Sequence, residues 1–116
     1  MPLSDTPWSR GKCAYKLIQC MACGIPVVAS PVGANIDVVL PRCGLLADSP
    51  QQWLAAFRQL ADDPALRLRF GAAGRCLVEQ RYSLRSALPV LTGVIQRIAA
   101  AHSDSDLFLK PRSTHC

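Results

Sequence analysis

The segment GKCAYKLIQCMACGIPVVASPVGAN, residues 11–35, holds the signals that decide the fold. In its first half, apolar residues recur at the i, i+3, i+4 and i+7 spacing that places them on one face of an α-helix. They are Ala14, Leu17, Ile18, Met21 and Ala22. Gly24 can close a helix as a C-cap, and Pro26 cannot continue one. The pattern predicts a helix over residues 14–23.

A short strand is expected directly after this helix. The run IPVVAS, residues 25–30, is rich in β-branched residues and shows no alternation of apolar and polar positions. Such a run is typical of a strand that is buried on both faces, as in a parallel sheet. The following PVGAN would be a loop at the carboxyl end of the strand, where open α/β sheets bind their ligands.

Two helices are predicted by their start signals. Ser49 is an N-cap, Pro50 stands at the first helical position, and Gln52 completes a capping box. The pair Asp63 and Pro64 starts the next helix in the same way. The residues expected to face inward are Trp53, Leu54, Phe57, Leu60 and Ala61 in the first helix, and Leu66, Phe70, Ala73 and Leu77 in the second.

Glycines inside the second of these helices predict a close contact. Gly71 and Gly74 each cost about 1 kcal/mol relative to alanine in a helix interior. Their presence indicates that another segment packs closely against the helix at these two positions.

The remaining elements are less sharply marked. Residues 36–40 could form a short helix or a strand, and LLA at residues 45–47 is a possible short strand. Ser83 or Ser86 is expected to cap a last helix with Leu88, Leu91, Ile95 and Ile98 in register, and a cap at Ser86 would place Pro89 in its first turn. From His102 onward the chain is polar and lacks periodicity, which predicts a disordered tail.

The order of elements predicts an α/β fold that is mostly helical, with one or two short parallel strands. One or two strands do not make a stable sheet by themselves. We therefore expect residues 1–101 to be part of a larger α/β layer structure, and residues 102–116 to be a polar tail.

Composition limits the classes of function. Charged residues make up 18% of the chain and the net charge is +5, which suits an anionic ligand or weak contact with an acidic membrane surface. The arginines are spread along the predicted helices, so no nucleic-acid partner is expected. The first ten residues lack the apolar core of a secretion signal, and no apolar run is long enough for a membrane span. The six cysteines are therefore expected to be reduced thiols in a cytoplasmic protein.

Two candidate sites lie within residues 11–35. Gly11 and Lys12, followed by Lys16, suggest a phosphate-binding helix start, because free N–H groups and the helix dipole favour anions there. Cys20 and Cys23 form a CxxC, but a structural zinc site needs four ligands and no second ligand pair is present. Their place at the carboxyl end of the helix also favours the thiol over the reactive thiolate. Small buried cysteines are the preferred interpretation, and metal or thiol chemistry is the alternative.

The quoted segment resembles the donor-binding segment of the group 1 glycosyltransferases, which are retaining enzymes that use a nucleotide sugar. The run DSPQQWLAAFRQLADDPALRLRFGAAGRCLVEQRYSL, residues 48–84, resembles the closing part of the same family. The resemblance implies the GT-B fold, with two Rossmann-like domains and the active site between them. This chain would be the last part of the second domain, and it would lack the acceptor domain.

The resemblance also implies roles for particular residues. The loop and helix start that face the diphosphate would be Gly11, Lys12, Cys13 and Ala14, and the residues of the loop beside the nucleotide would include Ser30, Val32, Gly33 and Asn35. Gln19 stands where the family usually has the glutamate that holds the ribose, and Gly11 stands where its other glutamate lies. With Lys16, these residues are the expected site for a UDP- or GDP-sugar.

No catalytic residue, metal or further cofactor is assigned by the resemblance. The expected partners are the nucleotide sugar and either a missing N-terminal domain or a second copy of the chain, with membrane contact at most peripheral. The isolated chain is expected to be inactive. The alternative is a non-catalytic helical interaction module, since a partial Rossmann-like domain leaves a sheet edge and apolar helix faces uncovered.

Overall fold

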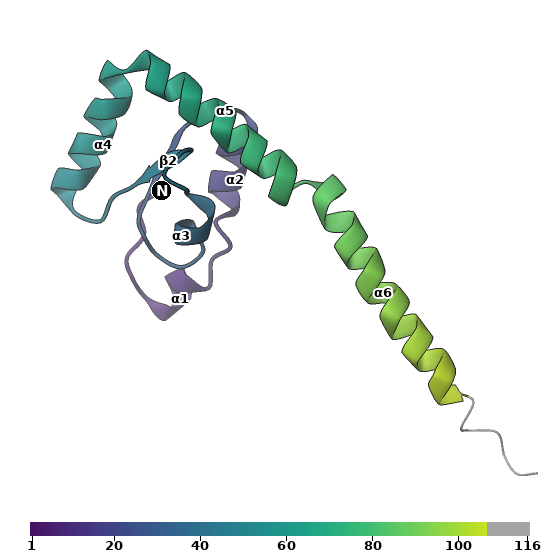
Figure 1. The fold of residues 1–116 in the computed structure, drawn as a ribbon. Coiled ribbons are helices and arrows are strands. Elements are labelled where there is room, and N and C mark those ends of the chain that lie inside the picture. Colours follow the sequence, from purple (N-terminus) through teal and green to yellow (C-terminus); the bar gives the residue numbers. More distant parts are fainter. Residues whose placement is uncertain (107–116) are drawn as a thin grey trace, which may run out of the picture. The chain divides into compact units, whose positions relative to one another are not determined.

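The computed structural model describes residues 1–106, which divide into two compact units. The first unit is Met1–Tyr82, and the second begins at Ser83. In chain order, the elements of the first unit are α1 (Pro7–Arg10), α2 (Tyr15–Ala22), β1 (Val27–Ala29), α3 (Asn35–Val38), β2 (Gly44–Leu46), α4 (Pro50–Asp62) and α5 (Pro64–Arg81) (Figure 1). The second unit contains α6 (Leu84–Asp106).

The first unit is built around a two-stranded parallel sheet. Val27 of β1 pairs with Gly44 of β2, and Ala29 pairs with Leu46. Both predicted strands are therefore confirmed, as is a mostly helical α/β arrangement. Residues 36–40, which could have been a helix or a strand, contribute to the helix α3.

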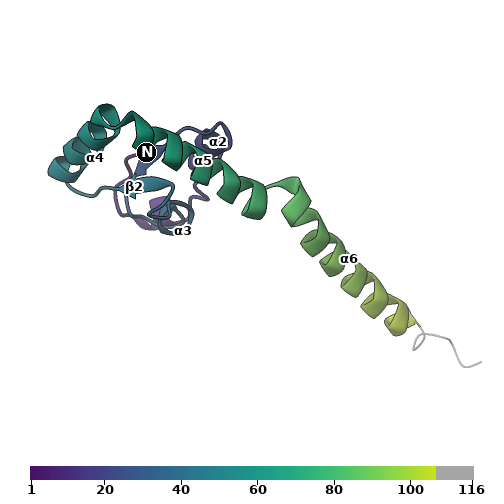
Figure 2. The ribbon, with the colours of Figure 1, turned by 45° about the horizontal axis from the view of Figure 1, so that its top comes forward.

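Helices cover both faces of this sheet, which explains the uninterrupted apolar run in β1. Val27 and Ala29 belong to a buried cluster with side chains of α2 and α5, whereas Val28 packs with Ala47 and with Ala56 of α4. Figures 1 and 2 show β2 between α4 on one side and α2 on the other. Because alternate residues of a strand point to opposite faces, all three residues of β1 are buried.

The end of α2 follows the prediction closely. Gly24 has φ +71°, the left-handed conformation that glycine adopts without steric cost. Its N–H donates to the carbonyl oxygen of Met21 at 2.9 Å, and the N–H of Ile25 donates to that of Cys20 at 3.0 Å. These two bonds form a Schellman motif, which satisfies carbonyl groups that the helix leaves unpaired.

The predicted starts of α4 and α5 are also confirmed. Ser49 accepts a hydrogen bond from the N–H of Gln52, and the Gln52 side chain accepts one from the N–H of Ser49. Asp63 accepts one from the N–H of Leu66 at 2.8 Å. Both helices begin with proline after the cap, where its missing N–H costs nothing.

Close packing against α5 explains its glycines, as predicted. A Cβ atom added to Gly71 would lie 2.0 Å from the carbonyl oxygen of Gly24, and one added to Gly74 would lie 3.3 Å from the Met21 side chain. The carboxyl end of α2 and its cap therefore rest directly on the α5 backbone. Leu66, Phe70 and Leu77 point inward, and Ala73 is partly buried.

The predicted inward face of α4 is wrong in part. Leu54 and Phe57 are about half exposed, at 50% and 55%, and Ala61 is exposed as well. Ala56 is the buried residue of this helix, with Trp53 and Leu60 partly buried beside it. The physical reason is that α4 packs against a sheet of two strands, which is too narrow to cover its whole apolar face.

The helix α6 begins at its Ser83 cap rather than at Ser86. The N–H of Ser86 donates to Oγ of Ser83 at 3.2 Å, so Pro89 lies inside the helix and not in its first turn. The helix extends past His102, where the sequence predicted the tail to begin. Residues 107–116 of the predicted tail lie outside the described residues. Within residues 1–106, no helix is both long and apolar enough to cross a membrane.

Candidate functional site

Two loops meet at the carboxyl end of β1. The first loop, residues 11–14, joins α1 to α2, and the second, residues 30–34, joins β1 to α3. Gly33 of the second loop lies against the backbone of Arg10, because a Cβ added to Gly33 would be 2.6 Å from the carbonyl oxygen of Arg10 and 2.9 Å from its Cα. The structure thus brings together the two segments that the sequence assigned to one site.

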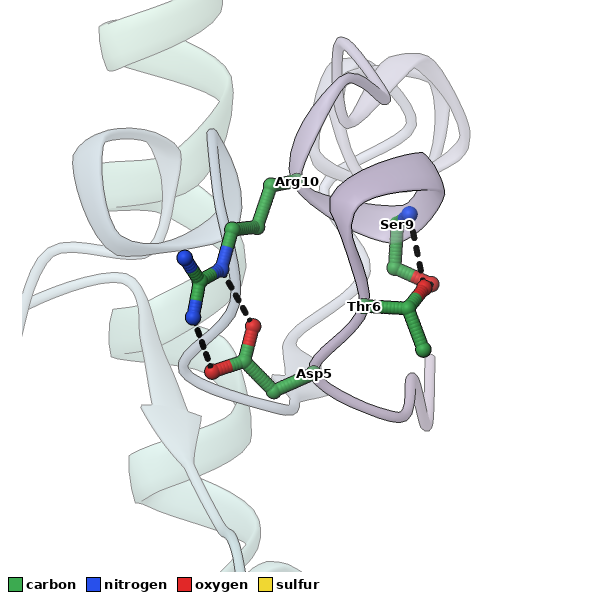
Figure 3. Close-up of polar contacts among 4 residues, drawn as sticks. All are labelled: Asp5, Thr6, Ser9 and Arg10. Carbon is green, nitrogen blue, oxygen red and sulfur yellow. Dashed lines mark hydrogen bonds and ion pairs between the residues drawn. The ribbon is translucent and has the colours of Figure 1, made fainter.

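Polar contacts around α1 fix the first loop. Oγ1 of Thr6 accepts a hydrogen bond from the N–H of Ser9 and caps the helix, whereas Asp5 accepts two bonds from the Arg10 guanidinium, at 2.6 and 2.8 Å (Figure 3). The hydrogen bond from Arg10 holds the pKa of the Asp5 carboxyl below its ordinary value. Arg10 is therefore paired within its own segment, and it is not counted among the cations offered to a ligand.

The predicted helix over residues 14–23 is confirmed to within one residue at each end, but the expectation that Gly11 and Lys12 lie at its start is wrong. Gly11 is the C-cap of α1, and its N–H donates to the carbonyl oxygen of Pro7. Lys12 lies in the turn that follows, and α2 begins only at Tyr15. A short helix ahead of Gly11 was not predicted, and its bonds within residues 5–11 explain why Gly11 and Lys12 do not belong to the start of α2.

Ala14 opens α2 in an unusual conformation. It has φ +55° and is the one described residue other than glycine with a positive φ. Alanine in the left-handed region costs about 1–2 kcal/mol, and such strain is concentrated at functional sites. Ala14 is 2% exposed, and its carbonyl oxygen accepts from the N–H groups of Leu17 and Ile18. The N–H groups of Tyr15 and Lys16 precede these and have no acceptor within the helix.

Side chains of the first loop and of the adjoining helix are exposed. Among the predicted site residues, these are Lys12, Cys13, Lys16 and Gln19. A shallow cavity of about 220 Å³ lies beside Lys12 and is also lined by Pro7, Trp8 and Gly11. The Trp8 side chain is 81% exposed there.

Polar side chains in the second loop and at the start of α3 are buried and bonded within the protein. Asn35 is 1% exposed, and its Nδ2 donates to the carbonyl oxygen of Ser30 at 2.9 Å. Oγ of Ser30 accepts from the N–H of Leu3 at 2.9 Å, and Val32 is buried. These three side chains shape the loop, so a ligand beside it would meet Gly33 and the backbone.

The cysteines do not gather into a site within residues 1–106. No group of three or more His, Cys, Asp or Glu side chains could hold a metal ion in this part of the chain. Cys20 is partly buried and Cys23 is exposed, both as free thiols. Cys43 is fully buried, and burial raises the pKa of its thiol.

Sequence reasoning missed two features that position the site. Thr6 followed by Pro7 is a helix start of the same kind as Ser49 followed by Pro50, and it could have been recognised. The contact between Gly33 and Arg10 joins segments distant in the sequence, and no local pattern announces it.

Comparison of the sequence with known proteins shows the family of this chain. The family model described as "Glycosyl transferases group 1" matches residues 2–63, which include both loops. A GDP-mannose-dependent monoacylated alpha-(1-6)-phosphatidylinositol monomannoside mannosyltransferase of Corynebacterium glutamicum is 33% identical over 81 residues, which are 68% of this chain and 21% of that protein. A D-inositol 3-phosphate glycosyltransferase of Pseudarthrobacter chlorophenolicus is 42% identical over 59 residues, which are 48% of this chain and 14% of that protein.

The chain thus spans about a fifth or less of the length of these curated relatives. No solved structure matches it. The family match covers more than half of the chain and contains the sheet, α2 and the two loops. The chain belongs to the group 1 glycosyltransferases.

Proposed function

We propose that this chain forms part of the nucleotide-sugar-binding domain of a GT-B glycosyltransferase, and that it binds the diphosphate of a UDP- or GDP-sugar at the first loop. The chain's family is the group 1 glycosyltransferases. The name of the Corynebacterium glutamicum relative describes it as GDP-mannose-dependent. GDP-mannose is therefore the first donor to test.

The observation that carries the proposal is the left-handed Ala14 at the start of α2. It turns the chain so that the N–H groups of Tyr15 and Lys16 lie at the helix N-terminus, where the helix dipole favours an anion. The exposed side chains of Lys12 and Lys16 add positive charge to the same segment. A diphosphate would receive charge-assisted hydrogen bonds there, which are stronger than bonds between neutral groups.

The rest of the donor would lie toward the second loop. Gly33 touches the backbone of Arg10, the last residue of α1, so a nucleotide at the adjoining first loop would lie beside residues 30–34. Gln19 is exposed on α2, and its amide can donate to or accept from a ribose hydroxyl. Gly11 and Gln19 stand where the family usually has glutamates, and neither carries a carboxylate. The site would therefore bind a donor without the two negative charges of those glutamates.

A change in nucleotide binding tests the proposal directly. Lys12→Ala should raise the dissociation constant for GDP about tenfold, as expected for the loss of one charge-assisted hydrogen bond. Arg97→Ala is the control, because it removes the same charge from α6, where the guanidinium bonds to the carbonyl oxygen of Gly93. Titration calorimetry with GDP and UDP measures both variants. Equal weakening by the two substitutions would reduce the effect to net charge and contradict the site.

The isolated chain should show no measurable glycosyl transfer. Holding donor and acceptor in reactive geometry is worth about 7–11 kcal/mol of the barrier, and residues 1–116 cover only about a fifth or less of the length of the matched relatives. Gln19→Glu should therefore not restore turnover. The assay follows nucleotide release from GDP-mannose and other donors in the presence of lipid extracts. Acceptor-dependent release above a heat-inactivated control would contradict this expectation.

A second candidate function rests on α6. Leu84, Leu88, Leu91, Ile95 and Ile98 are each more than half exposed and follow the alternating four- and three-residue spacing of a helix that pairs with another helix. This stripe favours an interaction module, as a second copy or another helix would bury it. Light scattering measures whether the chain associates with itself. Self-association that is lost in Leu91→Ser would favour this candidate. A monomeric unsubstituted chain would count against pairing of α6 with a second copy. The cytoplasmic location and the pairing with another domain stay predictions.

A further inference from the structure

The outer edge of β2, on the side away from β1, presents backbone groups that can pair with another strand. The N–H of Ala47 donates to the carbonyl oxygen of Ala29 at 2.9 Å, so Ala47 faces β1, as does Leu45 two positions earlier. By alternation, the N–H and carbonyl groups of Gly44 and Leu46 face the outer edge. Within residues 1–106 the sheet contains only β1 and β2, so no described strand uses these groups.

An apolar groove of about 390 Å³ accompanies this edge. Its lining residues are Ile36, Val39, Pro41, Gly44, Leu45 and Leu46. The side chains of Ile36 and Leu46 are 52% and 38% exposed. Gly44 and Leu46 share one face of the sheet, and Val39 packs on that face, since a Cβ added to Gly44 would lie 2.8 Å from Cγ1 of Val39. A side chain placed opposite Gly44 from outside would therefore meet an apolar surface.

The charged residues that flank β2 are placed symmetrically about Leu45. Arg42 precedes the strand, Asp48 follows it, and each is three positions from Leu45. Both side chains are exposed, and neither forms an ion pair within the described part of the chain. In an antiparallel pair of two β2 strands centred on Leu45, Arg42 of each copy would stand beside Asp48 of the other, and opposite charges at such positions stabilise the pair.

We propose that a second copy of this chain docks on the outer edge of β2, antiparallel to the first and related to it by a two-fold axis at Leu45. Gly44 of each copy exchanges two backbone hydrogen bonds with Leu46 of the other, as residues that face each other in an antiparallel ladder do. The Leu46 side chain of each copy enters the groove of the other beside Val39. Arg42 of each copy forms an ion pair with Asp48 of the other.

Charge complementarity favours a second copy over another partner, because both members of the ion pair stand on the same strand. It also fixes the direction of pairing. A parallel arrangement in the same register would place Arg42 beside Arg42 and Asp48 beside Asp48, which like charges disfavour. The antiparallel arrangement uses the same surface on both copies, so the contact closes as a dimer and does not extend into a filament.

The test reverses these charges in the full chain carrying Leu91→Ser, so that association through α6 does not contribute. Arg42→Asp places like charges beside each other twice in its own dimer, and Asp48→Arg does the same. A mixture of the two variants restores both ion pairs, because the new carboxylate of one chain faces the new guanidinium of the other, and the remaining native charges also face each other. Arg58→Asp is the matched control, since it makes the same change of charge at an exposed position of α4.

Sedimentation equilibrium should show a weak dimer of the Leu91→Ser chain, with a dissociation constant of about 0.1 mM, because the interface is small. Arg42→Asp and Asp48→Arg should each raise this constant about tenfold or more, and their equimolar mixture should regain the original value. Arg58→Asp should change it by about twofold or less. A monomeric Leu91→Ser chain, a mixture no more associated than its components, or an equal loss in Arg58→Asp would overturn the proposal.

Hydrogen exchange tests the register of the pair. The Leu46 amide should exchange more slowly as the protein concentration rises, whereas the Leu45 amide, which faces β1, serves as the internal reference. A dimer in which the exchange of the Leu46 amide does not depend on concentration would place the contact elsewhere and overturn the proposal. No nucleotide is added, so these outcomes are independent of whether the chain binds a donor.

Discussion

Gly71→Ala should destabilise the Met1–Tyr82 unit by about 3 kcal/mol, at the upper end of the cost of overpacking. The new Cβ would lie 2.0 Å from the carbonyl oxygen of Gly24, which is backbone and cannot rotate away. Relief of this contact requires that α5 move away from the capped end of α2. Urea unfolding followed by tryptophan fluorescence measures the loss, since Trp53 is partly buried beside the sheet.

Gly93→Ala is the matched control for this substitution. Gly93 also lies inside a helix, but no heavy atom would be within 4 Å of its new Cβ. Alanine should therefore favour α6 by about 0.5–1 kcal/mol through its higher helix propensity. A loss of stability at Gly71 no larger than the change at Gly93 would show that α2 and α5 do not pack as described.

Gly33→Ala should destabilise the same unit by about 2–3 kcal/mol and abolish nucleotide binding at the first loop. Gly33 has φ +55°, where alanine is strained, and its new Cβ would lie 2.6 Å from the carbonyl oxygen of Arg10. The second loop would be forced away from the end of α1 and the first loop that follows it, and the nucleotide would lose one side of its site. Unfolding and GDP titration measure the two effects separately.

Gly11→Ala separates this steric effect from a general sensitivity of the loops. Gly11 has φ −77°, and its added Cβ would lie 3.5 Å from the carbonyl oxygen of Trp8, an ordinary contact. The Gly11 variant should remain folded and keep most of its affinity for GDP. Similar losses in both variants would mean that contact between the loops does not shape the site.

Much of the fold could be predicted because its signals are local. The caps at Ser49 and Asp63 act within one helical turn, and the residues that form each bond are neighbours in the sequence. The buried β1 strand is likewise visible in a run of adjacent residues. Gly71 and Gly74 were informative because glycine in a helix is unfavourable unless something lies close to it.

The predictions that failed depend on contacts that distant segments supply. Leu54 and Phe57 have helical spacing, but whether they are buried depends on how wide a sheet α4 covers. Gly11 and Lys12 were expected at the start of α2, but Gly11 is the C-cap of α1 and Lys12 lies in the turn that follows. The hydrogen bond from the Met1 amine to the carbonyl oxygen of Val28 has no sequence signal, since it joins residues that are 27 positions apart.

The sequence predicted which residues belong to the candidate site. It did not predict which of their side chains are exposed to a ligand and which hold the loop in place. Sequence reasoning assigned Ser30 and Asn35 to the ligand, whereas the structure uses their side chains to hold the second loop. It assigned Lys12 and Lys16 as well, and these side chains are exposed and available. A side chain that binds a ligand and one that shapes a loop can be the same residue type, so only the packing distinguishes them.

We expect a nucleotide diphosphate to bind between the start of α2 and the loop after β1. A titration of the ¹⁵N-labelled protein with GDP-mannose, followed by amide chemical shifts, tests it most directly. The largest changes should fall on Tyr15, Lys16 and Gly33, with little change along α4 and α6. Saturable changes that spare residues 11–16 and 30–35, or no change at millimolar nucleotide sugar, would contradict it.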